Sequence, residues 1–104
     1  MVRKALPSDA EQLRLLNIEF NDEEEMTVEN IRDSLRNNPQ EIVIVDEEEG
    51  TLTGFVCVQL KRSFCYKDVT PELTEVYVRP AYRRRGIAGR MILFAERYCN
   101  AIAF

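Results

Sequence analysis

The stretch from Glu72 to Tyr98 limits the fold of this 104-residue chain more than any other part of it. Residues 73–78 have the β-branched and aromatic content of a strand. Pro80 ends that strand, because proline has no N–H to donate to a sheet. Apolar residues then recur at helical spacing and predict an amphipathic helix. These residues are Ile87, Met91, Phe94, Ala95 and Tyr98.

The turn between this strand and this helix has the chemistry of an anion site. The first N–H groups of a helix lack intrahelical partners, and the helix dipole adds positive potential there. Gly86 and Gly89 allow a ligand to approach the backbone closely. Neighbouring arginines can fork onto phosphate oxygens. They are Arg83, Arg84, Arg85 and Arg90. The sequence therefore predicts a phosphate or pyrophosphate site in this turn.

Residues 83–88, Arg-Arg-Arg-Gly-Ile-Ala, follow a Val-x-Val-x-Pro strand end. They fit a pattern of Gln or Arg, two residues, Gly, one residue, and Gly or Ala. In this context the pattern resembles the GNAT superfamily of N-acetyltransferases. The resemblance implies acetyl-CoA as co-substrate, its pyrophosphate held by the turn. The turn residues so implied are Arg83, Arg84, Arg85, Gly86, Ile87, Ala88 and Gly89.

The resemblance also assigns a role to the strand before the turn. It implies that the backbone of Val76 and Val78 pairs with the pantetheine arm as an added strand would. The N–H groups around Val76, Tyr77 and Val78 would then face the thioester carbonyl.

The remaining chain predicts alternating helices and strands. Residues 2–5 suggest a strand, and the Ser8–Glu11 capping-box spacing places a helix start near Asp9. Thr27 is a candidate N-cap for a second helix. Residues 41–46 and 52–60 suggest strands. Leu13, Leu15, Leu16, Ile18 and Phe20 are expected to form the buried face of the first helix.

The resulting order is β-α-α-β-β-β-α, an α+β fold with helices packed on a mostly antiparallel sheet, of the GNAT type. Gly54 suggests a β-bulge or a close approach of another backbone segment. Asn100 suggests the end of the last helix. Residues 1–104 are expected to form one GNAT-like domain that is incomplete at its C-terminal side. Full family members continue with another strand, a helix and a closing hairpin, and residues 102–104 suggest the start of that strand. The chain is then either a fragment or a short form completed by a partner subunit, as in a homodimer.

Charge and composition exclude several classes of function. The net charge is −4, and the basic cluster is confined to one turn, which favours a compact anion over nucleic acid. No apolar run could span a membrane, and the N-terminus lacks a secretory signal, so cytoplasmic residence is expected. Three cysteines without metal-like spacing, and no histidine, argue against a disulfide framework, a metal site or a cysteine nucleophile.

Two glutamates on the strand are candidates for the catalytic base that takes the amine proton. They are Glu72, which we prefer slightly, and Glu75. Strict alternation would place them on opposite faces of the sheet unless a bulge intervenes. A salt bridge to a neighbouring arginine is an equally good reading of either glutamate. Tyr77 and Tyr82 are better read as packing residues than as acids.

The predicted function is acetyl-CoA-dependent N-acetylation of a primary amine by direct attack. Acidic patches favour a small cationic acceptor, aminoglycoside- or polyamine-like. The alternatives are a non-catalytic coenzyme A-binding module and a protein N-terminal acetyltransferase. The acidic run at residues 22–25 is either a solvated loop or the rim of the acceptor site. Phe64, Cys65 and Tyr66 are expected to pack under the sheet, or else to line the acceptor pocket or a dimer contact.

Overall fold

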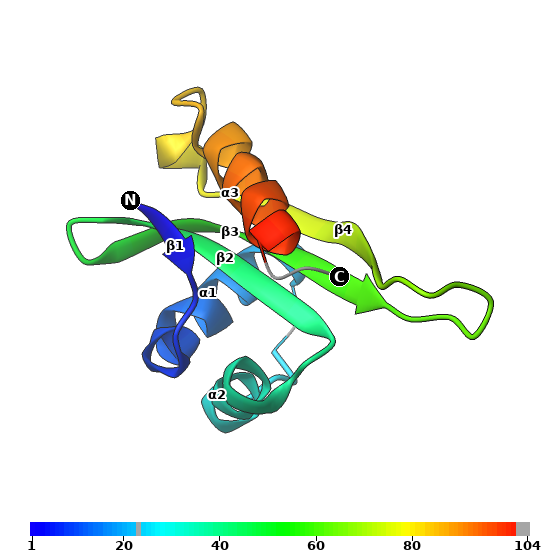
Figure 1. The fold of residues 1–104 in the computed structure, drawn as a ribbon. Coiled ribbons are helices and arrows are strands. Elements are labelled where there is room, and N and C mark those ends of the chain that lie inside the picture. The colour runs from blue at the N-terminus through cyan, green and yellow to red at the C-terminus, as the bar shows by residue number, and fades with distance from the viewer. Residues whose placement is uncertain (23, 102–104) are drawn as a thin grey trace.

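The computed structural model describes residues 1–22 and 24–101. Its elements are β1 (Val2–Lys4), η1 (Pro7–Asp9), α1 (Ala10–Asn21), α2 (Val28–Asn37), β2 (Glu41–Glu48), β3 (Thr51–Lys61), β4 (Thr70–Val78), η2 (Pro80–Tyr82) and α3 (Ile87–Ala101). The strands form one antiparallel sheet in the order β1-β2-β3-β4. Helix α3 covers one face, and α1 and α2 cover the other (Figure 1). This arrangement confirms the predicted α+β fold class.

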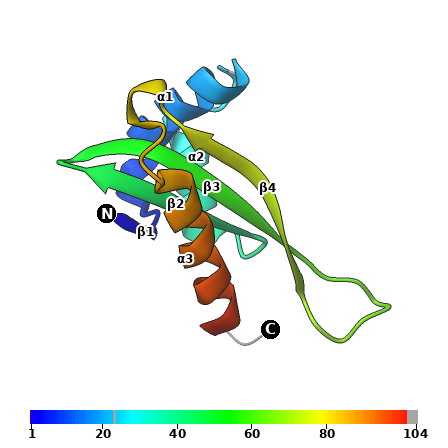
Figure 2. The same cartoon turned by 90° about the horizontal axis from the view of Figure 1, so that it is seen from above.

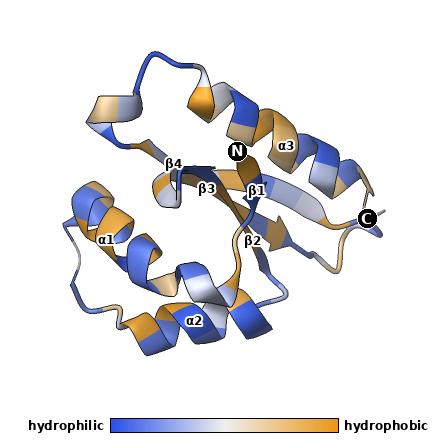
Figure 3. Ribbon diagram, turned by 90° about the vertical axis from the view of Figure 1, so that its left-hand side faces the viewer, coloured by the Kyte–Doolittle hydropathy of each residue, from blue (hydrophilic) through white to orange (hydrophobic). Residues whose placement is uncertain are grey.

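The sheet separates two apolar cores. Ile42 and Ile44 point toward α3, whereas Val43 and Val45 belong to the cluster beneath α1 and α2. The continuous apolar run of β2 is therefore explained by a strand that is covered on both faces. In Figure 3 hydrophobic and hydrophilic residues alternate along the helices, as the sequence periodicity predicts.

The two helices before β2 begin with different caps. Thr27 caps α2 as predicted, because its Oγ1 accepts the Asn30 N–H at 3.0 Å. At η1 the carboxylate of Asp9, instead of the Ser8–Glu11 pair, accepts the Leu6 N–H at 2.7 Å. On α1 the predicted apolar face is also narrower than expected. Leu13 and Leu16 are buried, whereas the Leu15 side chain is 53% exposed.

Helix α3 follows its predicted stripe and extends further than expected. Ile87, Met91 and Ala95 are buried against the sheet, together with Cys99. Asn100 lies inside the helix, so the prediction that it ends α3 is wrong. The strand expected at residues 102–104 falls outside the described residues.

Gly54 is required where β3 passes β4. A Cβ placed on Gly54 would lie 2.3 Å from the carbonyl oxygen of Tyr77, a distance that no side chain could tolerate. The sequence prediction of a close backbone approach at this position is therefore confirmed.

The loop at residues 62–69 projects beyond the body of the molecule (Figure 2). The Phe64 side chain is fully exposed and that of Tyr66 is 74% exposed, so the prediction that they pack under the sheet is wrong. The physical reason is that β2 starts at Glu41, opposite Gln59. Beyond that point no strand of residues 1–22 and 24–101 covers that side of β3. None of the helices in residues 1–22 and 24–101 has the length and hydropathy of a membrane-spanning segment.

Candidate functional site

A β-bulge in β4 decides how its two glutamates face. Glu75 pairs with Cys57 and Leu73 pairs with the next β3 residue, Val58, so Thr74 is the extra residue in β4. Glu72 pairs with Gln59, which shares a face of β3 with Cys57. The bulge therefore returns Glu72 to the same face as Glu75, the face toward α1 and α2. This is the exception to strict alternation that the sequence analysis allowed for.

The two glutamates nevertheless have different surroundings. The Glu72 carboxylate forms an ion pair with Lys61, with an N–O distance of 2.5 Å, and is half exposed. Glu75 is less exposed, accepts a hydrogen bond from Thr74 Oγ1 at 2.6 Å, and lines a pocket. The position of Glu75 therefore suits contact with a bound molecule better than that of Glu72.

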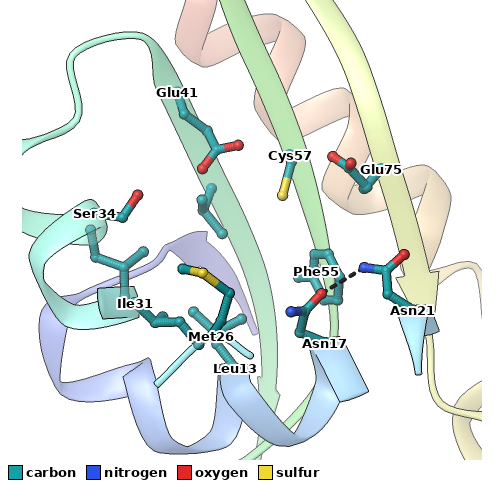
Figure 4. A pocket seen from close by; sticks show the side chains of 12 residues that line it. Leu13, Asn17, Asn21, Met26, Ile31, Ser34, Glu41, Phe55, Cys57 and Glu75 are labelled. Carbon is teal, nitrogen blue, oxygen red and sulfur yellow. Dashed lines mark hydrogen bonds between the residues drawn. The ribbon is translucent and has the colours of Figure 1, made fainter. Parts of the chain in front are cut away.

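This pocket, of about 210 Å³, lies between the sheet and helices α1 and α2 (Figure 4). Its apolar wall consists of Leu13, Met26, Ile31, Leu35, Val43 and Phe55. Its polar lining consists of Asn17, Asn21, Ser34, Glu41, Cys57 and Glu75. Asn21 and Met26 flank the acidic run at residues 22–25, so the ends of that loop reach the pocket. Asp22 and Glu24 are exposed.

Burial and charge raise the pKa values of two pocket groups. Burial is the main cause of the raised pKa of Glu41, and the negative charge of Glu75 adds to it, against a hydrogen bond from Gln59. Burial also raises the pKa of the Cys57 thiol, and Glu41 and Glu75 raise it further. A raised pKa disfavours the thiolate, which is the nucleophilic form of cysteine. Sequence reasoning missed Glu41, and only the register of β2 against β3 could have placed it here.

The turn after β4 has the backbone that an anion site requires. Arg84 and Gly86 adopt left-handed conformations, with φ of 66° and 75°. Arg83 Nε donates to the Val78 carbonyl at 2.8 Å, and Arg90 Nη1 donates to the Arg85 carbonyl at 2.8 Å. The two side chains thus fold back onto the turn and hold its shape.

Backbone N–H groups at the mouth of α3 have no partner among the described residues. The first helical bond is Arg90 N–H to the Gly86 carbonyl, at 3.1 Å. Within the described residues, no group accepts from the N–H groups of residues 84–89. Gly86 and the arginines before it are exposed, whereas Ile87 is buried and anchors the helix. A Cβ on Gly89 would meet nothing within 4 Å. The turn therefore fits a diphosphate group, with free donors and room beside the backbone.

Aromatic and charged side chains connect the turn to α1. The Tyr77 hydroxyl donates to Glu19 Oε1 at 2.9 Å, and the Arg83 guanidinium lies 5.7 Å from the Tyr77 ring centroid. Arg79 pairs with the same Glu19 carboxylate, with an N–O distance of 2.9 Å. Tyr77 thus links the pocket side of the sheet to the turn. The described residues contain no group of three potential metal ligands.

A model of the acetyltransferase (GNAT) family matches residues 8–103. The chain belongs to the GNAT acetyltransferase family. No curated protein matches its sequence at a significant level. Among solved structures, an aminoglycoside acetyltransferase from an uncultured soil metagenomic sample matches with a TM-score of 0.83 and 15% identity, over 100% of this chain and 72% of that one.

Two further structures show the same GNAT fold. A ribosomal-protein-alanine N-acetyltransferase from Brucella melitensis biovar Abortus 2308 has a TM-score of 0.81 and 16% identity, over 97% of this chain and 71% of that one. An acetyltransferase from Vibrio fischeri has a TM-score of 0.76 and 23% identity, over 98% of this chain and 88% of that one. At these identities the structural likeness establishes the fold, and the choice of acceptor has to be argued from the GNAT domain itself.

Proposed function

We propose that this GNAT domain transfers an acetyl group from acetyl-CoA to a primary amine of a small cationic acceptor. The observation that carries the proposal is that β4 leads directly from a carboxylate-lined pocket to a turn with open N–H groups. One strand would therefore connect the acceptor to the coenzyme. A related aminoglycoside N-acetyltransferase, with a TM-score of 0.77 and 18% identity, was solved in complex with CoA, which supports coenzyme binding by this fold.

Each part of the site has a task in the proposed reaction. Residues 83–89 would hold the diphosphate through backbone N–H groups, with Arg84 and Arg85 at its outer side. The backbone of residues 76–78 would pair with the pantetheine arm. The bound thioester supplies an activated acyl group, and the amine nitrogen gains the acetyl group as the sulfur leaves and ends as a thiol.

Glu75 is the proposed proton acceptor. An ammonium group must lose a proton before its nitrogen can attack, and a carboxylate that lines the acceptor pocket is placed to take it, directly or through water. Glu72 was the slightly preferred candidate on sequence, but its ion pair with Lys61 removes the reason for that preference.

Two alternatives to this proposal are distinguished by turnover and by the preferred acceptor. A coenzyme A-binding module would bind the coenzyme without releasing thiol, and a protein N-terminal acetyltransferase would accept a peptide in preference to small amines. The small pocket favours a small acceptor. Cytoplasmic residence and a homodimer belong to the same proposal.

The turn assignment is tested by Gly86→Asp. Acetyl-CoA is expected to raise the Tm of the wild type because it binds the folded state preferentially. At a concentration a hundredfold above Kd, this binding adds about 2.7 kcal/mol to the free energy of unfolding. The variant places a carboxylate beside the diphosphate and should abolish that shift. Thermal melts with and without acetyl-CoA provide the measurement.

Gly50→Ala is the matched control, because Gly50 also has a positive φ, of 83°, and lies in the β2–β3 hairpin turn. It should lower the Tm through backbone strain and retain the shift with acetyl-CoA. Normal coenzyme binding by Gly86→Asp would overturn the turn assignment, and with it both the enzyme and the binding-module hypotheses.

A further inference from the structure

We infer that Glu41 is a specificity-determining residue and that, together with Glu75, it selects an acceptor with two cationic groups on a short aliphatic chain. The inference rests on the proposed function, since it names the acceptor class of the same pocket. It starts from the geometry of the two carboxylates. Figure 4 shows the Glu41 and Glu75 side chains on opposite sides of Cys57, both directed toward it.

The two carboxylates lack a protein cation. None of the ion pairs among the described residues includes Glu41 or Glu75. Their partners are neutral: Gln59 donates to Glu41 at 2.5 Å, and Thr74 donates to Glu75 at 2.6 Å. Half-buried charges without a counter-ion are unfavourable, and a bound cation would compensate them. Burial and the nearby charge of Glu75 raise the pKa of Glu41, which agrees with an unfavourable charged form.

The positions of the carboxylates set the distance between two bound charges. Glu41 lies on β2 and Glu75 on β4, with one strand between them. Glu41 pairs with Gln59 and Glu75 pairs with Cys57, so the two residues are also offset by two positions along the strands. Two strand spacings and this offset place their backbones about 12 Å apart, and the two side chains reach inward from there. A chain of a few methylene groups with an ammonium at each end spans the remaining distance. In the proposed reaction the ammonium at Glu75 would react, and the one at Glu41 would hold the acceptor in register.

The apolar part of the pocket lining favours methylene groups over sugar hydroxyls. Leu13, Val43 and Phe55 contribute to it, and on the polar side Asn21 Nδ2 is already bonded to Asn17 Oδ1 at 2.6 Å. Hydroxyl groups buried against such a wall would lose hydrogen bonds to water. The volume of about 210 Å³ also lies below the ~300–1,000 Å³ of pockets for drug-sized ligands. Both features favour a slender diamine over an aminoglycoside ring system.

The experiment measures binding without turnover. The Kd values of 1,4-diaminobutane and 1-aminobutane are determined by calorimetry or NMR titration of the whole chain, in the wild type and in Glu41→Gln. We expect the wild type to bind the diamine on the order of tenfold or more tightly than the monoamine. Glu41→Gln should remove that preference and leave monoamine binding unchanged. The substitution is isosteric and keeps an acceptor for Gln59.

Glu24→Gln removes an exposed carboxylate from the loop at the pocket edge and is the matched control. It should retain the diamine preference, which would exclude a general effect of net charge. Equal binding of the two amines by the wild type, or an unchanged preference in Glu41→Gln, would overturn the inference. If the protein prefers the diamine but releases no thiol, the proposed acetyl transfer is rejected and the role of Glu41 stands. If monoamines and diamines release thiol with equal efficiency, the role of Glu41 is rejected and the acetyl transfer stands.

Discussion

At the scale of single residues, the neighbour of a carboxylate decides what it can do. Glu72 and Glu75 share a strand and a face, and both were candidates on sequence. Lys61 neutralises the first, whereas the second faces a pocket with another uncompensated glutamate. Side-chain type and spacing could identify the two candidates. Choosing between them required a lysine that only the strand pairing brings close.

This difference predicts unequal effects of two isosteric substitutions. Glu75→Gln should lower kcat by about 10²–10⁴-fold, the usual contribution of a general base, with coenzyme binding retained. Glu72→Gln should keep activity within a few-fold, because an exposed ion pair contributes little. Thiol release with an amine acceptor measures kcat, and the thermal shift with acetyl-CoA verifies that the coenzyme site is intact. Equal losses in the two variants would contradict the choice of Glu75.

At the scale of elements, most of the fold was readable from the sequence. Hydrophobic periodicity, cap and turn residues placed the three α-helices and four strands of the described residues. Most of them bury a regular apolar pattern, whereas α2, which has no fully buried residue, was marked by its Thr27 cap. The bulge at Thr74 and the projecting loop at residues 62–69 were not predictable in the same way. Both depend on where neighbouring strands begin and pair, which local sequence does not encode.

The bulge makes a prediction about deletions in β4. Removing Thr74 should leave the pairing on both sides intact, because Leu73 and Glu75 already face adjacent β3 residues. The Tm should fall by only a few degrees. Removing Val76 should instead reverse the faces of one side of β4 and cost several kcal/mol, since a one-residue slip exposes its apolar side chains. Thermal melts compare the two deletions, and similar losses would contradict the assigned register.

At the scale of the whole molecule, Arg3 on β1 connects the start of the first helical segment to strand β2. Arg3 bonds both carboxylate oxygens of Asp9, at 2.8 and 2.9 Å, and pairs with Glu47 on β2 at 2.9 Å. Burial alone would raise the pKa of Asp9, but the hydrogen bonds from Arg3 and from the Leu6 N–H outweigh it. The pKa of this carboxyl therefore lies below its ordinary value of 3.8.

A lowered carboxyl pKa gives the direction of the acid response. The folded state binds this proton more weakly than the unfolded state does, so the stabilisation is complete above the ordinary pKa and is lost as the pH falls through the lowered one. Asp9→Asn should cost about 1.5–3 kcal/mol at pH 7, and the difference from wild type should shrink below about pH 4. Urea unfolding across pH measures it. Glu11→Gln, an exposed control in the first turn of α1, should change stability by less than about 0.5 kcal/mol at any pH.

The last strand of the sheet leaves one side open. In the described part of the chain, β4 pairs only with β3, so its outer row of N–H and C=O groups has no strand beside it. Such a border accepts any extended chain of matching spacing, including the same border of another molecule. At high concentration, two copies joined along this line would form one continuous sheet. A ligand that lies along the border would keep the copies apart, so solubility itself should respond to what the strand holds.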